Sequence, residues 1–468
     1  MQQPQNRREY LTTTPVPKLI LSLSVPTIIS MLVTAIYNTA DTFFVARVSD
    51  NPAVNTAATA SVGLVFTVMA IIQAFGFFFG HGSGNYLSRM LGAGNHKEAN
   101  EMASTGFAMA IIVGVVFAIV GNLFVEPIAH FLGATDATMQ FTCDYMRIIL
   151  LGAPFMMAQF VINNQLRFQG SAFYAMVGLM SGAVMNMVLD PLLILGFHMQ
   201  VRGAAIATVM GQLTSFIVLF IGTTKGENIK MSFANVQLNG HYLIEVINGG
   251  APSLFRQGLA AISTLLLNRT AGALGGEQFG AAAIAGMSVA GRIMLMMGSA
   301  LIGFGQGYQP VCSFNYGAGL TKRVKEGFKF CVKYSTIFLI IIGIIFYKFA
   351  PEIISLFFKD IADTDLNSVQ TLEFGKEVGT AALRYMCMSL PLSGAIVISN
   401  MMLQSIGKGF KASVTASARN GFCFIPLIII LPKFLGIQGV EMAQACADVL
   451  SLLIAVPMAY TELRKFND

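Results

Sequence analysis

Two carboxylates interrupt apolar segments of the chain, and an amide and a hydroxyl accompany them. Asn186 and Asp190 lie four residues apart in the stretch MNMVLDPLLIL, so both side chains share one face if the stretch is helical. Asp41 lies in a similar apolar run, and Thr208 lies in the run that follows Asp190. Together the four side chains would offer hard oxygen ligands for sodium, or a proton shared between coupled carboxylates.

A structural role is the alternative for the second aspartate, because Asp190 precedes Pro191 and could cap or pin the packing there. A charged side chain that faces lipid costs about 2.5–3.5 kcal/mol or more at the centre of a membrane helix. Intramembrane acids therefore mark ion or substrate pathways in most cases. We favour the functional interpretation, and the structural one stays open.

The composition is that of a membrane protein. Of the 468 residues, 55% are hydrophobic and only 11% are charged, whereas soluble proteins carry about 25% charged residues. The net charge of +6 does not indicate a nucleic-acid partner, because the lysines and arginines gather in short loops between apolar runs. Six cysteines without CxxC spacing make a metal or disulfide role improbable. The glycine-rich stretch 76–90 lacks the GK[ST] ending of a phosphate loop, so we expect no enzyme and no cofactor beyond a coupling ion.

Apolar runs of about 20 residues or more predict an all-α polytopic membrane protein with twelve transmembrane helices. The predicted spans lie near 18–46, 55–87, 98–122, 139–166, 171–196, 203–224, 241–271, 279–311, 324–347, 378–405, 410–432 and 438–461. Basic turns such as GAGNHK and GAGLTKRVKEGFK lie inside if both termini are cytoplasmic, as the positive-inside rule requires. The acidic segment 359–377 is then an outside loop.

The two halves of the sequence resemble each other. GAGNHKEANE begins at Gly92 and GAGLTKRVKE at Gly317, an offset of 225 residues, and SVPTII around Pro26 matches GAPSLF around Pro252. An ordered series of such matches indicates duplication, with two six-helix bundles related by a pseudo-two-fold axis along the membrane normal. We predict an N-terminal lobe (1–224), a cytoplasmic linker (225–240) and a C-terminal lobe (241–468).

The order of these motifs resembles the multidrug and toxic compound extrusion (MATE) transporters over nearly the whole chain. The residues that carry the resemblance are SVPTIISMLVTAIYNTADTFFVA around Pro26, GAGN after the second span and NMVLDP in the fifth. The likeness is greatest to the prokaryotic branch of DinF-like and MepA-like pumps. It implies paired six-helix bundles that export drugs in exchange for protons or sodium.

The resemblance also implies residue roles. Asp41 matches an aspartate implicated in cation coupling, Asn186 and Asp190 match the pair on the fifth helix, and Thr208 matches a hydroxyl on the sixth. The second half offers a check, since Leu267 replaces Asp41 and the apolar segment 428–431 replaces Asp190. The duplicated architecture therefore does not itself demand the carboxylates, and we expect coupling in the N-terminal lobe.

Other polar residues at membrane depth have open roles. The candidates for a substrate cavity are Tyr37, Asn38, Asn163, Arg256 and Gln257. The amides are equally suited to holding helices together. Asp448 is expected to form an internal ion pair with an arginine, for which Arg292 and Arg419 are candidates, although a substrate-selecting charge is the alternative. Pro26 and Pro252 are predicted to kink their helices.

These observations favour a cation-coupled efflux antiporter that works by alternating access on small, mostly cationic drugs or toxic compounds. We expect a monomer in the bacterial cytoplasmic (inner) membrane, with the lipid bilayer as its surroundings and no nucleic-acid partner. A flippase for lipid-linked precursors is the alternative, supported by the arginines of the second half. The duplicated lobes argue against a channel or receptor.

Overall fold

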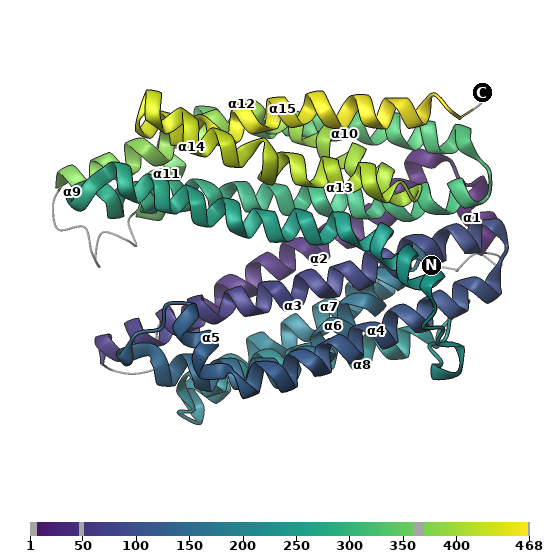
Figure 1. The fold of residues 1–468 in the computed structure, drawn as a ribbon, viewed down its shortest axis with the longest axis horizontal. Coiled ribbons are helices and arrows are strands. Elements are labelled where there is room, and N and C mark those ends of the chain that lie inside the picture. Colours follow the sequence, from purple (N-terminus) through teal and green to yellow (C-terminus); the bar gives the residue numbers. More distant parts are fainter. Residues whose placement is uncertain (1–6, 46–50, 359–368, 467–468) are drawn as a thin grey trace. The chain divides into compact units, whose positions relative to one another are not determined.

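The computed structural model describes residues 7–45, 51–358 and 369–466, apart from the side chains of 35–43, 52, 53, 277 and 369. Within these residues every regular element is a helix, as predicted (Figure 1). Eleven helices of this part are long and apolar enough to cross a membrane, judged by length and composition. The chain is therefore an all-α polytopic membrane protein.

The chain forms two compact units. Unit 1 comprises Met1–Leu254, Gln306–Leu320 and Ser405–Gly407, and unit 2 comprises Phe255–Gly305, Thr321–Gln404 and Lys408–Asp468. The elements up to the linker are α1 (Arg7–Thr13), α2 (Val16–Val45), α3 (Pro52–Ala93), α4 (His96–Leu123), α5 (Val125–Phe131), α6 (Asp136–Phe168), α7 (Ala172–Pro191), η1 (Leu192–Gly196), α8 (Gln200–Thr223) and η2 (Phe233–Asn235). The later elements are α9 (Gly240–Gly317), α10 (Thr321–Lys348), α11 (Ala350–Phe358), α12 (Val369–Ser405), α13 (Gly409–Ser417), η3 (Ala418–Phe422), α14 (Phe424–Leu435) and α15 (Ile437–Leu463).

The predicted seventh and eighth spans form one long element, α9. Its backbone is helical except at Gly276, where φ is 62° and ψ is −163°, values that glycine adopts without strain. The part after this kink, Gln278–Gly317, is one of the eleven apolar helices, whereas the part before it is helical but not among them. Polar side chains such as Arg256 and Arg269 lower the hydropathy of that first part.

Unit 1 is built around α6. This helix packs against α3, α4 and α8, and α7 packs against both α8 and α2 (Figure 1). The buried side chains of α6 include Tyr145 and Met146, which belong to one continuous apolar cluster. Pro154 lies against Gly114 of α4, where a β-carbon would meet the proline backbone. Small residues thus allow the close helix approach that membrane bundles rely on.

Two corresponding glycines hold α3 and the end of α9 in backbone contact. A β-carbon on Gly92 would overlap the carbonyl oxygen of Phe314, and one on Gly317 would overlap the carbonyl oxygen of Arg89. Gly92 and Gly317 are the residues that open the two GAG motifs. The duplicated motif therefore forms a symmetrical crossing, in which each copy packs its glycine against the other helix.

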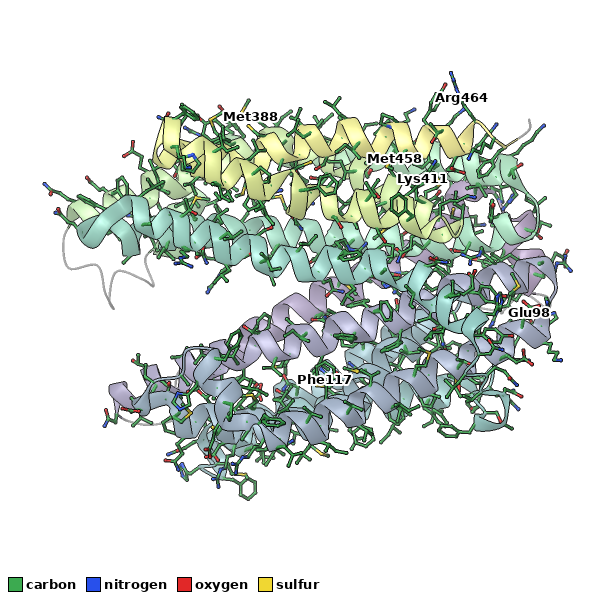
Figure 2. The ribbon with its side chains drawn as sticks, viewed as in Figure 1. Glu98, Phe117, Met388, Lys411, Met458 and Arg464 are labelled. Atoms are coloured by element: carbon green, nitrogen blue, oxygen red, sulfur yellow. The ribbon has the colours of Figure 1, made fainter. Side chains whose placement is uncertain are left out.

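A polar cluster ties α3 and α4 to the start of α9. The Tyr86 hydroxyl donates to Glu98 Oε2 at 2.6 Å and lies 2.9 Å from His241 Nε2. Because the hydroxyl proton is given to Glu98, Nε2 of His241 must be the donor in the second bond. Glu98, labelled in Figure 2, belongs to the first turn of α4, and Asn95 caps that turn through the Glu98 backbone N–H.

Replacing Tyr86 with phenylalanine should lower the free energy of unfolding by about 1–3 kcal/mol, because two part-buried polar groups lose their partner. Thermal unfolding of the purified protein in detergent measures the change. Tyr10→Phe is the matched control, since the Tyr10 hydroxyl meets Ser22 Oγ at an exposed position. Equal effects of the two variants would contradict the role assigned to Tyr86.

The predicted linker is packed against unit 1 along most of its length. The backbone N–H of Ile229 donates to Gln169 Oε1 at 2.7 Å, and that of Gln237 donates to Thr105 Oγ1 at 2.9 Å. Two backbone N–H groups of the segment 225–240 thus bind side chains of α4 and of the end of α6.

Unit 2 has its own apolar core, to which α12, α14 and α15 contribute. The start of α12 differs from the prediction of an outside loop over 359–377, because the helix already begins at Val369. Leu372 and Phe374 pack against the core of the unit. Burial of these apolar side chains favours helix where the neighbouring acidic residues suggested a loop.

Candidate functional site

Asn186 and Asp190 lie on the buried face of α7. Asp190 is fully buried and Asn186 is 3% exposed. Asn186 Nδ2 lies 3.4 Å from Asp190 Oδ1, so the amide can donate to the carboxylate one helical turn away. Within the described residues the Oδ1 atom of Asn186 is buried without a hydrogen-bond partner. A buried carbonyl oxygen in that condition is suited to receive a cation or a water molecule.

Asp190 directly precedes Pro191, the last residue of α7, and the chain continues without interruption as the π-helical turn Leu192–Gly196. The helical backbone therefore extends beyond the carboxylate, which is fully buried.

A small cavity of about 30 Å³ in unit 1 is lined by Asn186 of this pair, whereas Asp190 is not among its lining residues. Thr208 of α8 and Asn186 both line it, so the structure brings together two of the predicted site residues around a common space. A cavity of at least about 10–15 Å³ can hold one water molecule, and a bare sodium ion is smaller still. The site therefore has both the oxygen atoms and the room for one small cation.

Sequence reasoning missed several residues that line the cavity. They come from α2, α6, α7 and α8 and comprise Thr34, Gln159, Phe160, Leu179, Gly182, Ala183, Gly211, Gln212 and Ser215. Gln159 donates through Nε2 to Gln212 Oε1, and this bond links α6 to α8. The signal was present in the sequence, because both glutamines interrupt apolar runs at membrane depth.

Asp41, the remaining residue that we predict to bind the coupling cation, lies on α2. Asp41 falls within this helix, as do the cavity candidates Tyr37 and Asn38, but all three side chains lie outside the described residues. α2 also passes through Pro26 without a non-helical residue, and α9 does so through Pro252. The marked departure from helical backbone in α9 is at Gly276.

The other cavity candidates occupy different places. Asn163 is buried, and its Nδ2 donates to the Ala175 carbonyl at 2.9 Å, which joins α6 to α7. In unit 2, Arg256 Nη1 donates to Asn400 Oδ1 at 3.2 Å, and neighbouring Gln257 is half-buried. Asn163 and Arg256 therefore hold helices together in this structure.

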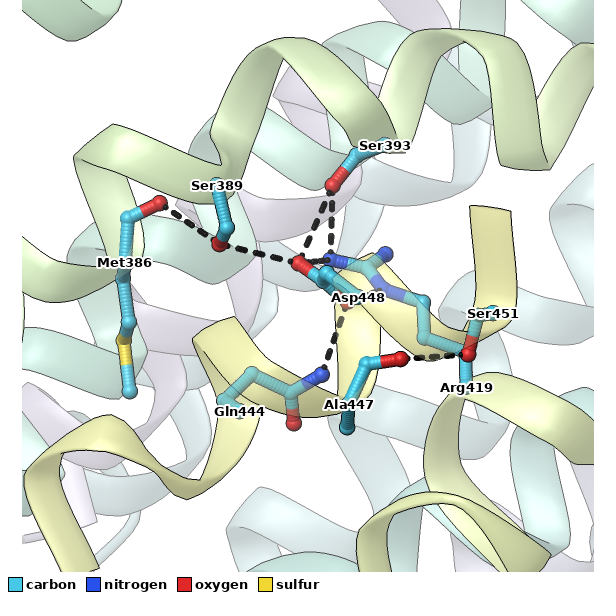
Figure 3. Close-up of polar contacts among 8 residues, drawn as sticks. All are labelled: Met386, Ser389, Ser393, Arg419, Gln444, Ala447, Asp448 and Ser451. Carbon is cyan, nitrogen blue, oxygen red and sulfur yellow. Dashed lines mark hydrogen bonds and ion pairs between the residues drawn. The ribbon is translucent and has the colours of Figure 1, made fainter. Parts of the chain in front are cut away.

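The buried carboxylate of Asp448 forms an ion pair in unit 2 with Arg419, whose side chain is 27% exposed. Arg419 Nε lies 2.7 Å from Asp448 Oδ1, and Ser389, Ser393 and Gln444 also donate to the carboxylate (Figure 3). Arg292, the other arginine considered for this role, forms no ion pair with the residues the structure describes. Side chains of unit 2 thus satisfy the carboxylate of Asp448.

The family model MatE matches residues 26–192 and 252–431, which is most of both halves. The chain belongs to the MatE family. It is therefore a transporter and not an enzyme. The matched ranges include Asp41, Asn186 and Asp190 and end before Asp448.

Curated relatives of this MatE protein extend over nearly its whole length. The multidrug export protein MepA of Staphylococcus saprophyticus is 26% identical over 454 residues, covering 96% of this chain and 95% of the relative. MepA of Staphylococcus aureus strain MSSA476 is 27% identical over 456 residues, with the same two coverages.

Solved structures share the fold. A MOP superfamily transporter from Pyrococcus furiosus, described as having a binding pocket of reverse polarity, aligns with a TM-score of 0.88 at 23% identity over 100% of both chains. An outward-facing multidrug resistance MATE family transporter aligns with a TM-score of 0.87 at 23% identity over 99% of both chains. The fold of these MATE and MOP transporters thus accounts for the helices described above.

Proposed function

We propose that the chain is a cation-coupled multidrug efflux antiporter that works by alternating access. Protons or sodium ions would bind in unit 1 at Asp41, Asn186, Asp190 and Thr208 and drive export of organic, mostly cationic compounds. The protein would act as a monomer in the bacterial cytoplasmic membrane, with both termini inside.

The observation that carries the proposal is the buried Asn186–Asp190 pair, of which Asn186 lines a small cavity together with Thr208. A buried carboxylate in an apolar bundle is expensive unless it is paired or binds a cation. Membership of the MatE family and the MepA relatives support drug export as the driven process.

Transport in proteoliposomes tests the proposal. We expect efflux of a cationic dye to be driven by an imposed proton gradient or sodium gradient, applied separately, and to stop when the gradient is collapsed. A set of cationic and anionic dyes defines the substrate charge. Dye movement that ignores both gradients would contradict ion coupling.

Flipping of lipid-linked precursors is the second candidate function. It would need cationic side chains that receive a phosphate, and Arg419 is already neutralised by Asp448. Arg256 is the observation that favours this function, because it contacts an amide and, among the residues the structure describes, has no carboxylate as a hydrogen-bond partner. Movement of a fluorescent lipid-linked phosphate between leaflets, lost in Arg256→Gln, would support it over drug export.

A further inference from the structure

The two units build one helix contact in the same way. In unit 1, Asn163 Nδ2 donates to the carbonyl of Ala175, 12 residues further along the chain, at 2.9 Å. In unit 2, Asn400 Nδ2 donates to the carbonyl of Ala412, also 12 residues further, at 2.6 Å. Both asparagines are buried. They therefore mark corresponding positions and align α7 with the α13–η3 segment.

A second pair of contacts aligns α8 with α15. A β-carbon on Gly203 or on Gly439 would meet the backbone of the element that precedes each helix. Counting along the chain from these glycines, Ser215 corresponds to Ser451, and both serines are buried. The two serines lie about three helical turns beyond the glycines, so their agreement supports the alignment of α8 with α15 over that length.

In this alignment the cavity of unit 1 corresponds to the ion pair of unit 2. Counting from the two asparagines, Gly182 corresponds to Arg419, and counting from the two glycines, Gln212 corresponds to Asp448. Gly182 and Gln212 line the cavity of unit 1. Where unit 1 has a small space beside polar side chains, unit 2 has a guanidinium held against a carboxylate.

The helices of unit 2 accommodate the larger side chain by a local change of backbone. In unit 1, a β-carbon on Gly182 would overlap the carbonyl oxygen of Gly211, so α7 and α8 are in close contact. Arg419 and Ala447 stand at the corresponding positions of unit 2. Arg419 lies in the π-helical turn Ala418–Phe422, and such turns are frequent at functional sites.

Both carboxylate oxygens of Asp448 accept several hydrogen bonds. Oδ1 accepts from Arg419 Nε at 2.7 Å and from Gln444 Nε2 at 3.1 Å. Oδ2 accepts from Ser389 Oγ at 3.1 Å, from Arg419 Nη2 at 3.3 Å and from Ser393 Oγ at 3.5 Å (Figure 3). Hydroxyls and amides also line the cavity of unit 1, where the carboxylate of Asp190 contacts the lining residue Asn186 without lining the cavity itself.

We propose that the side chains around Asp448 form a monovalent-cation site in unit 2, and that the guanidinium of Arg419 permanently occupies it. An arginine side chain stays charged at all physiological pH values and cannot leave the chain. The site of unit 2 is therefore closed to exchange with external ions. The cavity of unit 1, where glycine replaces the arginine, is open to exchange, so that within the residues the structure describes the chain has a single exchangeable cation site of this kind.

Removing the side chain of Arg419 should allow the site around Asp448 to bind a free cation. Arg419→Gly reproduces the residue of unit 1 and leaves the carboxylate of Asp448 without its counter-charge. We expect guanidinium chloride, at low millimolar concentrations far below denaturing ones, to raise the Tm of this variant saturably by about 2 °C or more. Tetramethylammonium chloride at equal ionic strength should have no such effect, because this ion is larger and donates no hydrogen bonds.

Two controls complete the experiment. The native protein, whose site is filled, and the double variant Arg419→Gly with Asp448→Asn, whose site lacks the carboxylate, should not respond to guanidinium. An equal response of the double variant, or no response of folded Arg419→Gly, would overturn the proposal. If folded Arg419→Gly can be purified only when guanidinium is present, that result would support the proposal. If this variant cannot be purified in folded form with or without guanidinium, whereas the double variant can, that result would overturn the proposal.

The cation site of unit 2 does not depend on ion-coupled transport, since guanidinium binding is measured without any gradient. Only the conclusion about one exchangeable site rests on the proposed function. If efflux proves independent of ions, guanidinium rescue can still succeed, and the two failures are therefore distinguishable.

Discussion

Replacing Asp190 with asparagine is expected to abolish ion-driven drug efflux while leaving the protein folded. Asparagine is close to isosteric, and it keeps an oxygen acceptor for Asn186 Nδ2, which lies 3.4 Å from the carboxylate in the native structure. The charge that attracts a cation or releases a proton is lost. Coupling free energies of about 1–3 kcal/mol correspond to factors of 5–150, so gradient-driven efflux should fall by about tenfold or more.

Asp144→Asn is the matched control for this variant. Asp144 lies on α6 and pairs with Arg202 at 3.0 Å, where the arginine side chain is 60% exposed. Surface ion pairs contribute about 0–1 kcal/mol, so this change should leave both efflux and Tm nearly unchanged. Initial rates of dye efflux in proteoliposomes provide the measurement. Full activity of Asp190→Asn, or an equal loss of activity in Asp144→Asn, would contradict a role of Asp190 in ion coupling.

Alanine at Gly92 or Gly317 should clearly lower the stability of the folded protein. A β-carbon at either position would overlap a backbone carbonyl oxygen of the other helix, and backbone atoms cannot rotate away as a flexible side chain can. α3 and the end of α9 would have to separate. Overpacking of this kind costs about 1–3 kcal/mol, measured as a fall in Tm in detergent.

Gly298→Ala, in the same long helix α9, separates this steric effect from helix propensity. A β-carbon there would have no atom within 4 Å. Alanine is favoured over glycine by up to about 1 kcal/mol inside a helix, so this control should keep or raise the Tm. A fall equal to that of Gly317→Ala would contradict the proposed backbone crossing.

The apolar spans and the duplicated motifs could be read from the sequence because hydropathy and glycine patterns act locally. The four-residue spacing of Asn186 and Asp190 likewise placed the two side chains on one helix face, and the structure has them in contact. These features follow from helix geometry alone.

Other features depended on tertiary packing. The partner of Asp448 could not be chosen between Arg292 and Arg419, since the choice rests on the π-helical turn that contains Arg419. The bond between Gln159 and Gln212 joins helices distant in sequence. The early start of α12 reflects burial of Leu372 and Phe374, which outweighs the acidic residues around them.

Ion movement driven by drug is the most direct test of the central claim, because coupling between two binding processes is reciprocal. In proteoliposomes without an ion gradient, an imposed gradient of a cationic drug should move protons or sodium ions in the opposite direction. The ion flux should be present with the native protein and absent with Asp190→Asn. Drug movement without any opposing ion flux in the native protein would contradict the antiporter account.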